Sequence, residues 1–296
     1  MRYLEYFTDP YDGLIREEYF TEEKSYDDDQ EAYENELFED QRNFTYLDSF
    51  LTSNGKDMAV GTISLTPGAV SGVGVTFTTS SDVFVAGDVG KELWKKYENR
   101  AGGGRATITQ VNSTTEVVCD IDESFDNVEA IPAESWFLTT DTIGGLHHLE
   151  GETISVLADG RTHPDVTVDK GTVTLDRQVA VAVFGYSYKG VYKGLPLVLT
   201  GEGITTGGKK QNISRASILF YNSFYTKYGA DLYNLETVKT AQIGQKTDRP
   251  SLPVTGYEEV VFDDQWADTK FLTLVQDIPM PAKINAVVLD VEVGEE

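Results

Sequence analysis

Two adjacent histidines, His147 and His148, are the residues whose type best suits metal binding or proton transfer. Neighbouring side chains on a strand point to opposite faces, so both imidazoles could ligate one metal only across a bend. The chain has three histidines in all, and no pair of them flanks a glutamate as in zinc proteases. We interpret the pair as hydrogen-bonding groups beside a turn and expect no metal site.

A glycine-rich stretch at 203–210 resembles a phosphate-binding loop but does not complete the motif. It has the spaced glycines and Lys209, but Lys210 stands where the motif needs Ser or Thr for magnesium. The following residues alternate like a strand, whereas a phosphate loop leads into a helix. We interpret the stretch as a basic turn, and expect Lys209, Lys210 and Arg215 to pair with carboxylates of a neighbouring subunit.

Acidic pairs such as Glu258–Glu259 and Asp263–Asp264 could serve a glycosidase. However, 49 Asp and Glu residues produce such pairs by chance, and catalytic carboxylates need a defined separation across a cleft. The nucleophile motif Gly-x-Ser-x-Gly is absent, and Cys119 lies in a strand pattern without an evident base. The sequence therefore favours a non-enzymatic protein without a cofactor.

Charge is the strongest compositional feature of the chain. The formal net charge is −25, and residues 1–50 alone hold 16 Asp and Glu against 4 Lys and Arg. Phosphate backbones are bound by Lys and Arg, so we expect no specific nucleic-acid partner. The acid could keep the surface solvated, or let DNA slide past it. No apolar run is long enough to span a membrane, so we expect no membrane insertion.

The first 45 residues differ in composition from the rest. Purely disordered acidic tails are poor in aromatics, whereas this segment interleaves Tyr and Phe with its acids. We predict an extended acidic arm that docks on a neighbour, with a short helix at 31–42. The aromatic residues expected to make inter-subunit contacts are Tyr6, Phe7, Tyr11, Tyr19 and Phe20.

Beyond residue 60 the pattern has period two, which predicts a mainly β protein. Strands are expected at 61–66, 73–78, 105–111 and 116–121, which form a small antiparallel barrel or sandwich module at 60–140. Further strands are expected at 153–158, 166–168, 171–175, 179–186, 213–225, 271–275 and 284–291. They predict a larger antiparallel β-sandwich domain at 141–296.

Residues 144–160 resemble a signature of tail proteins from short-tailed bacteriophages, the nozzle or tail-tubular-like subunits also called stabilisation proteins. Later segments at 171–186, 208–222 and 276–294 follow in the same order, so that the resemblance covers 46–296. It implies a structural role for the motif residues Gly145, Leu146, His148, Leu149, Glu150, Gly151, Asp159 and Gly160.

Residues 46–49 resemble a strand that in such proteins runs directly into the motif, so the resemblance implies that a strand within 46–59 joins the domain at 141–296. Here about 95 residues intervene between that strand and the motif. The insert resembles a small β module that is annotated in phage proteins by analogy with a half-domain of ubiquitin-activating enzymes. That analogy implies no ubiquitin chemistry, because fold and function separate.

The resemblance implies a structural tail subunit (nozzle, sheath, collar or tube-associated ring), made in the bacterial cytoplasm and located in the virion tail. Its expected partners are copies of itself in a ring of sixfold or twelvefold symmetry, and other tail or connector proteins. One alternative is an appendage that binds a host surface receptor through the inserted module. A tail-associated polysaccharide hydrolase is the third interpretation.

Overall fold

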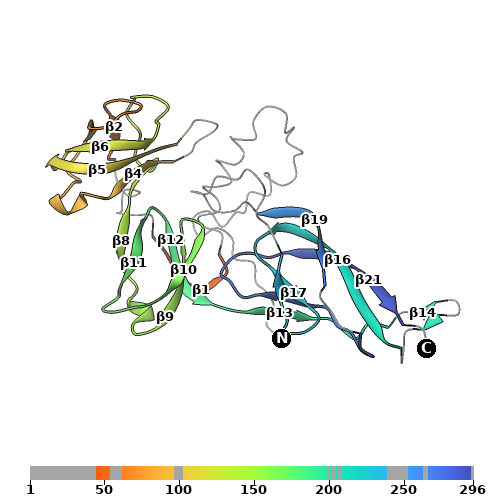
Figure 1. Cartoon of the computed structure of the whole chain (residues 1–296). Helices are drawn as coiled ribbons and strands as arrows, with labels where there is room; N and C mark the ends of the chain where they lie inside the picture. Colours follow the sequence, from red (N-terminus) through yellow and green to blue (C-terminus); the bar gives the residue numbers. More distant parts are fainter. Residues whose placement is uncertain are drawn as a thin grey trace. The chain divides into compact units, whose positions relative to one another are not determined.

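The computed structural model describes residues 45–53, 62–96, 103–198, 200–201, 204–205, 209–238, 253–262 and 266–294. These residues form antiparallel sheets with two single-turn 3-10 helices, which confirms a mainly β fold (Figure 1). Contacts divide the chain into two compact units, with the boundary between Tyr186 and Ser187. The range 141–296, predicted as one domain, is thus divided at that boundary. The predicted arm, its helix at 31–42 and its five aromatic contact residues lie outside the described residues.

The inserted module is a six-stranded antiparallel sheet. Its β5 and β6 form a long hairpin, in which Val, Ile and Ala alternate with polar residues so that one face is apolar. In sheet order the strands are β2 (Leu65–Pro67), β3 (Val75–Thr79), β6 (Glu116–Glu123), β5 (Gly104–Ser113), β4 (Glu92–Lys95) and β7 (Trp136–Leu138).

The sheet of the module curls until its two ends meet. Leu65 of β2 exchanges both backbone hydrogen bonds with Ile131, which precedes β7, at 3.0 and 2.7 Å. The Trp136 indole also donates to the Ile63 carbonyl oxygen at 3.0 Å. Register shifts between β5 and β6 provide bulges that increase the local curvature. The sheet is therefore a curled half-barrel with one bridge near its two ends, where the alternating pattern predicts a small barrel or sandwich.

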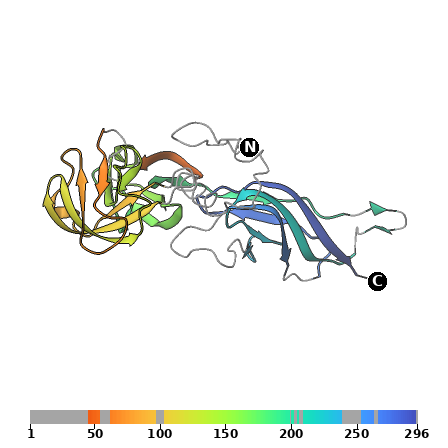
Figure 2. The same ribbon diagram turned by 90° about the horizontal axis from the view of Figure 1, so that it is seen from above.

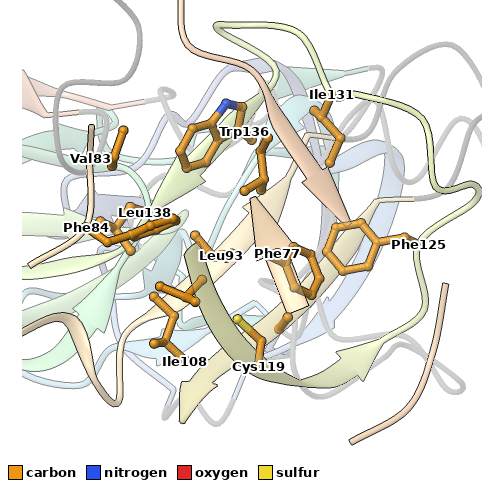
Figure 3. Packing of buried hydrophobic residues seen from close by; sticks show 13 residues of the cluster. Phe77, Val83, Phe84, Leu93, Ile108, Cys119, Phe125, Ile131, Trp136 and Leu138 are labelled. Atoms are coloured by element: carbon orange, nitrogen blue, oxygen red, sulfur yellow. The ribbon is translucent and has the colours of Figure 1, made fainter. Parts of the chain in front are cut away.

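Aromatic side chains fill the interior of the module (Figure 3). The Phe77 and Phe125 rings pack at 5.3 Å between centroids, and Trp136 is 1% exposed. The 3-10 helix η1 (Ala86–Asp88) closes one side through the buried Asp88 carboxylate, which lies 2.9 Å from the Lys91 ammonium. That carboxylate also accepts the Val85 N–H at 2.8 Å.

The rest of the first unit surrounds a second core, in which Val156, Leu149 and Phe184 are almost fully buried. Its four-stranded sheet runs β1 (Leu47–Ser53), β12 (Ala182–Ser187), β9 (Thr153–Ala158) and β10 (Arg161–Thr167). A two-stranded sheet pairs β8 (Thr140–Gly144) with β11 (Thr172–Val179), and the 3-10 helix η2 spans His147–Leu149.

Strand β1 precedes the module in sequence yet belongs to the sheet that follows it. A Cβ on Gly185 of β12 would lie 2.7 Å from the Asp48 carbonyl oxygen, so only glycine permits this close approach of the two strands. The module is therefore inserted between two strands of one sheet. Its Phe137 packs with Ala180 and Val181, which lie between β11 and β12, and Trp94 packs against this small cluster.

One strand prediction is wrong in detail. Residues 179–186 were expected to form a single strand, but β11 ends at Val179 and β12 begins at Ala182. The Asp159 carboxylate accepts the N–H groups of Ala180 and Val181 at 3.0 to 3.3 Å. These bonds replace ladder partners at that point, so the chain changes from one sheet to the other.

The second unit contains two main sheets that share one core, which includes Ile218, Phe220 and Leu274. The long strands β16 and β21 lie side by side in the view of Figure 2, and β19 flanks β16 on its other edge. The three-stranded sheet runs β19 (Val254–Val261), β16 (Gln211–Ser223) and β21 (Ile284–Val293). The four-stranded sheet runs β13 (Gly190–Lys193), β20 (Thr273–Gln276), β17 (Lys227–Gly229) and β18 (Glu236–Thr237). A short hairpin adds β14 (Thr200–Gly201) and β15 (Ile204–Thr205).

Candidate functional site

Residues 145–152 form the corner between β8 and β9. Leu146 and Leu149 are fully buried in the core of this part of the unit, and their backbones are joined by a hydrogen bond of 2.9 Å. Gly145 and Gly151 mark the two ends of the corner, where the backbone has positive φ. The corner thus buries two leucine side chains between two glycines at tight turns.

Glu150 connects this corner to the next hairpin. Its two carboxylate oxygens accept the N–H groups of Lys170 and Gly171 at 2.8 and 2.5 Å. Lys170 and Gly171 have φ of +53° and +69°, the conformation of a two-residue hairpin turn between Asp169 and Thr172. The carboxylate therefore caps a turn whose amides point out of the ladder, which is a structural function for an acid that could otherwise suggest catalysis.

Asp159 and Gly160 form a second turn of the same type, between β9 and β10, with φ of +49° and +73°. The Asp159 carboxylate accepts hydrogen bonds from the N–H groups of Ala180 and Val181, between β11 and β12. The Arg177 guanidinium adds a bond to the Ala158 carbonyl oxygen at 3.0 Å. In both turns a carboxylate binds backbone amides of a neighbouring segment.

The three histidines make separate, structural contacts. The His147 ring lies against Gly171, where an added Cβ would be 2.3 Å from Nδ1. His148 Nε2 lies 3.0 Å from the Ser49 carbonyl oxygen. His163 contacts the Pro164 carbonyl oxygen and the Asp176 carboxylate, both at 2.7 Å. The interpretation of the pair as hydrogen-bonding groups beside a turn agrees with the contact of His148, whereas the contact described for His147 is packing against Gly171.

Metal-ligating side chains and the single cysteine could each serve a functional site. No group of three or more His, Cys, Asp or Glu side chains within the described ranges could hold a metal ion. The Cys119 thiol is buried, and burial together with the nearby Asp120 raises its pKa from 9.0 to about 12. Such a thiol is a poor nucleophile at neutral pH, because the thiolate is the reactive form.

The basic residues singled out from the sequence lie at the start of β16. Lys210 is exposed, and its carbonyl oxygen accepts the Gly294 N–H at 2.8 Å, while Lys209 precedes it in a bend. Arg215 is exposed and forms an ion pair of 2.8 Å with Glu259 of the same chain. Of the acidic pairs, Glu258–Glu259 lies on β19, and Asp263–Asp264 lies outside the described residues.

An exposed apolar sheet face was not predicted. In the β19-β16-β21 sheet, Leu219 is opposite both Tyr257 and Ala286, and Ser217 is opposite Val288. Residues directly opposite in a ladder share a face, and this one points away from the core. We call it the outer β16 face, with the apolar members Leu219, Tyr257, Val261, Ala286 and Val288.

The outer β16 face is strongly exposed, at 63% for Tyr257, 61% for Val261 and 56% for Val288. A signal for it exists in the sequence, because 286–289 is a continuous apolar run (Ala-Val-Val-Leu) in a strand that has one buried face. Such a run means that the opposite face is also apolar. Sequence alone could not show that no second layer covers it.

No protein-family model matches this chain, and a search of curated proteins found no match to it. The described residues define a mainly β protein of antiparallel sheets. Within the described part of the chain, no helix has the length and apolarity needed to cross a membrane.

Proposed function

We propose that this chain is a non-enzymatic structural subunit of a bacteriophage tail that works as part of a closed ring. The resemblance at 46–296 supports the tail assignment. The geometry adds support for a structural role, because the motif residues act as packing and turn-capping groups (Glu150 and Leu149 are examples).

The observation that carries an assembly role is the outer β16 face. Three large apolar side chains on it are more than half exposed, in a chain with a net charge of −25. Contiguous exposed apolar patches on an otherwise charged surface mark protein interaction sites. The Arg215–Glu259 ion pair on the same face supplies polar groups beside the apolar residues, as at many protein interfaces.

The edges of the same sheet favour neighbours as well. Strands β19 and β21 are the two end strands among the described residues, and they are 8 and 10 residues long. Long end strands present backbone groups that another chain can pair with. A head-to-tail contact that uses one edge and one face closes into a ring when the rotation between subunits divides a full turn.

Light scattering tests this proposal through the mass of the full chain, alone and with other tail proteins. We expect the mass of a monomer for the chain alone and the mass of a ring when the other tail proteins are present. A monomer or trimer under every condition would contradict the proposal. The double variant Tyr257→Asp with Val288→Asp should abolish the ring. Burying two carboxylates without partners in the contact between subunits costs about 3 kcal/mol or more. Val73→Asp, in a module loop where Val73 is 82% exposed, is the matched control and should still assemble.

A receptor-binding appendage is the second candidate, and the inserted module provides the observation that favours it. Its loops expose apolar side chains, among them Val70, Val73 and Val128. The loop that holds Val70 is tied to the sheet by a hydrogen bond from Phe125 to the Val70 carbonyl oxygen at 2.9 Å. Deleting 61–140 separates the two: particles that assemble but do not adsorb indicate receptor binding, and tailless particles indicate structure.

A further inference from the structure

The end strand β13 and the residues after it form a second exposed apolar surface, distinct from the outer β16 face. Val191 and Tyr192 are 49% and 58% exposed, and Leu195 and Val198 are 85% and 60% exposed. Adjacent residues of a strand point to opposite faces, so both faces of the sheet are open at β13.

The geometry of this strand suits the addition of another strand. One side of β13 pairs with β20, and the pairing continues as Gly194 N–H and Leu197 N–H donate to Leu272 and Lys270 carbonyl oxygens at 2.8 and 3.0 Å. Among the described residues, the other side of β13 is an end of the four-stranded sheet. An extended apolar end strand of this kind is a template for an incoming chain.

The stretch of sequence that contains β13 is basic, although the chain as a whole is acidic, and in space Asp231 interacts with Lys193 of β13. Residues 187–230 hold six Lys and Arg and one Asp or Glu, although the whole chain has a net charge of −25. Lys189 immediately precedes β13, Lys193 is its last residue, and both are exposed. Lysines on an end strand discourage pairing with unselected strands, and they favour a strand that carries acids.

We propose that β13 binds the acidic N-terminal segment 1–44 of a second copy of this chain. That segment holds 15 Asp and Glu against 4 Lys and Arg, and ten Tyr or Phe. Its carboxylates match Lys189 and Lys193, and its aromatic side chains match the exposed Val191, Tyr192 and Leu195. This inference rests on the proposed ring, in which each chain offers one segment and one β13 to its neighbours.

Crosslinking between full-length chains tests the site. Cys119 is the only cysteine and is buried, so a new exposed cysteine is the reactive one. One chain carries Ser25→Cys, and a second, labelled with ¹⁵N, carries Leu195→Cys. After treatment with a short bismaleimide, we expect mass spectrometry to find peptides that join position 25 of one isotope to position 195 of the other. Val73→Cys replaces Leu195→Cys in the matched control and should give no such peptide.

The outcomes separate this inference from the proposed function, because light scattering measures the ring independently. A ring without the 25–195 crosslink overturns the β13 site and leaves the ring standing. A crosslink without a ring supports the site and contradicts the ring. A further variant carries Ser25→Cys and Leu195→Cys in one chain. If the crosslink forms only within this variant and never between two chains, the segment binds its own β13, which overturns binding between copies.

Charge substitutions on the same full-length chains provide a second readout. Lys189→Glu with Lys193→Glu should lower the crosslink yield by about tenfold, because like charges at a rim repel. Lys189→Arg with Lys193→Arg keeps both charges and should keep the yield. An unchanged yield in the Glu pair would show that charge does not select the segment, and would overturn the proposed acidic occupant.

Discussion

His148 Nε2 lies 3.0 Å from the backbone carbonyl oxygen of Ser49, although 99 positions separate the two residues. Ser49 belongs to β1, and His148 belongs to the 3-10 helix η2, which follows the inserted module. The contact therefore joins β1 to the corner between β8 and β9, two segments that the module separates in sequence. It gives the second histidine of the pair a structural role.

Replacing His148 should destabilise the sheet modestly. His148→Ala removes the donor to Ser49, and we expect the free energy of unfolding to fall by about 1 kcal/mol, as for one hydrogen bond. Urea unfolding measures this change. His148→Gln can place an amide N–H in the same region and should recover part of the loss; a loss as large in Gln as in Ala would indicate that ring packing matters instead.

Two glycines of the motif region should respond differently to alanine. Gly171 and Gly151 have φ of +69° and +76°, so alanine is strained at both by roughly 1 kcal/mol. At Gly171 the new Cβ also meets the His147 ring, whereas nothing lies within 4 Å at Gly151.

We therefore expect Gly171→Ala to destabilise the protein by about 3 kcal/mol and Gly151→Ala by about 1 kcal/mol. Thermal unfolding of the two variants beside the parent chain makes the comparison. Equal losses at the two positions would show that His147 moves aside without difficulty.

Cys119 should be inert in the folded protein. Burial and Asp120 raise its pKa from 9.0 to about 12, so at pH 8 the thiolate fraction is about a thousandfold lower than for a free thiol. We expect a thiol reagent to modify Cys119 only when urea unfolds the inserted module. Fast modification of the native chain would contradict the closed core of the module in the structure.

Tyr228 should make stability depend on pH in the alkaline range. Burial and the hydrogen bond to Glu236 raise the pKa of Tyr228 from 10.0 to about 12. Its hydroxyl lies 2.9 Å from Glu236 Oε2 and 3.1 Å from the Val261 carbonyl oxygen. Because the folded pKa is the higher one, this contribution is complete below pH 10 and is lost as the pH rises through about 12.

Tyr228→Phe removes both the hydroxyl and this titration. We expect it to lower the free energy of unfolding by about 1 kcal/mol at pH 8 and to flatten the decline above pH 10. Denaturant unfolding at several pH values measures both effects. Tyr233, which is 95% exposed, provides the control, and Tyr233→Phe should change neither.

Local patterns were sufficient to predict most strands. Alternation in 105–111 and 116–121 predicted β5 and β6, and the Asp159–Gly160 pair predicted the turn between β9 and β10. Such features depend on residues close in sequence. The break at Ala180 could not be predicted in this way, because its cause is a carboxylate 21 positions away.

The sequence by itself determined the β class, the acidic character and the absence of common catalytic motifs, since these follow from composition and short-range spacing. Tertiary structure decided that β1 pairs with β12, although the inserted module lies between them in sequence. It also decided that Tyr257, Val288 and Leu195 stay exposed. Alternation tells which way side chains point along one strand. Two further properties depend on contacts between distant segments: whether another layer covers the face of a sheet, and whether another strand pairs with its edge. Only the folded chain shows those contacts.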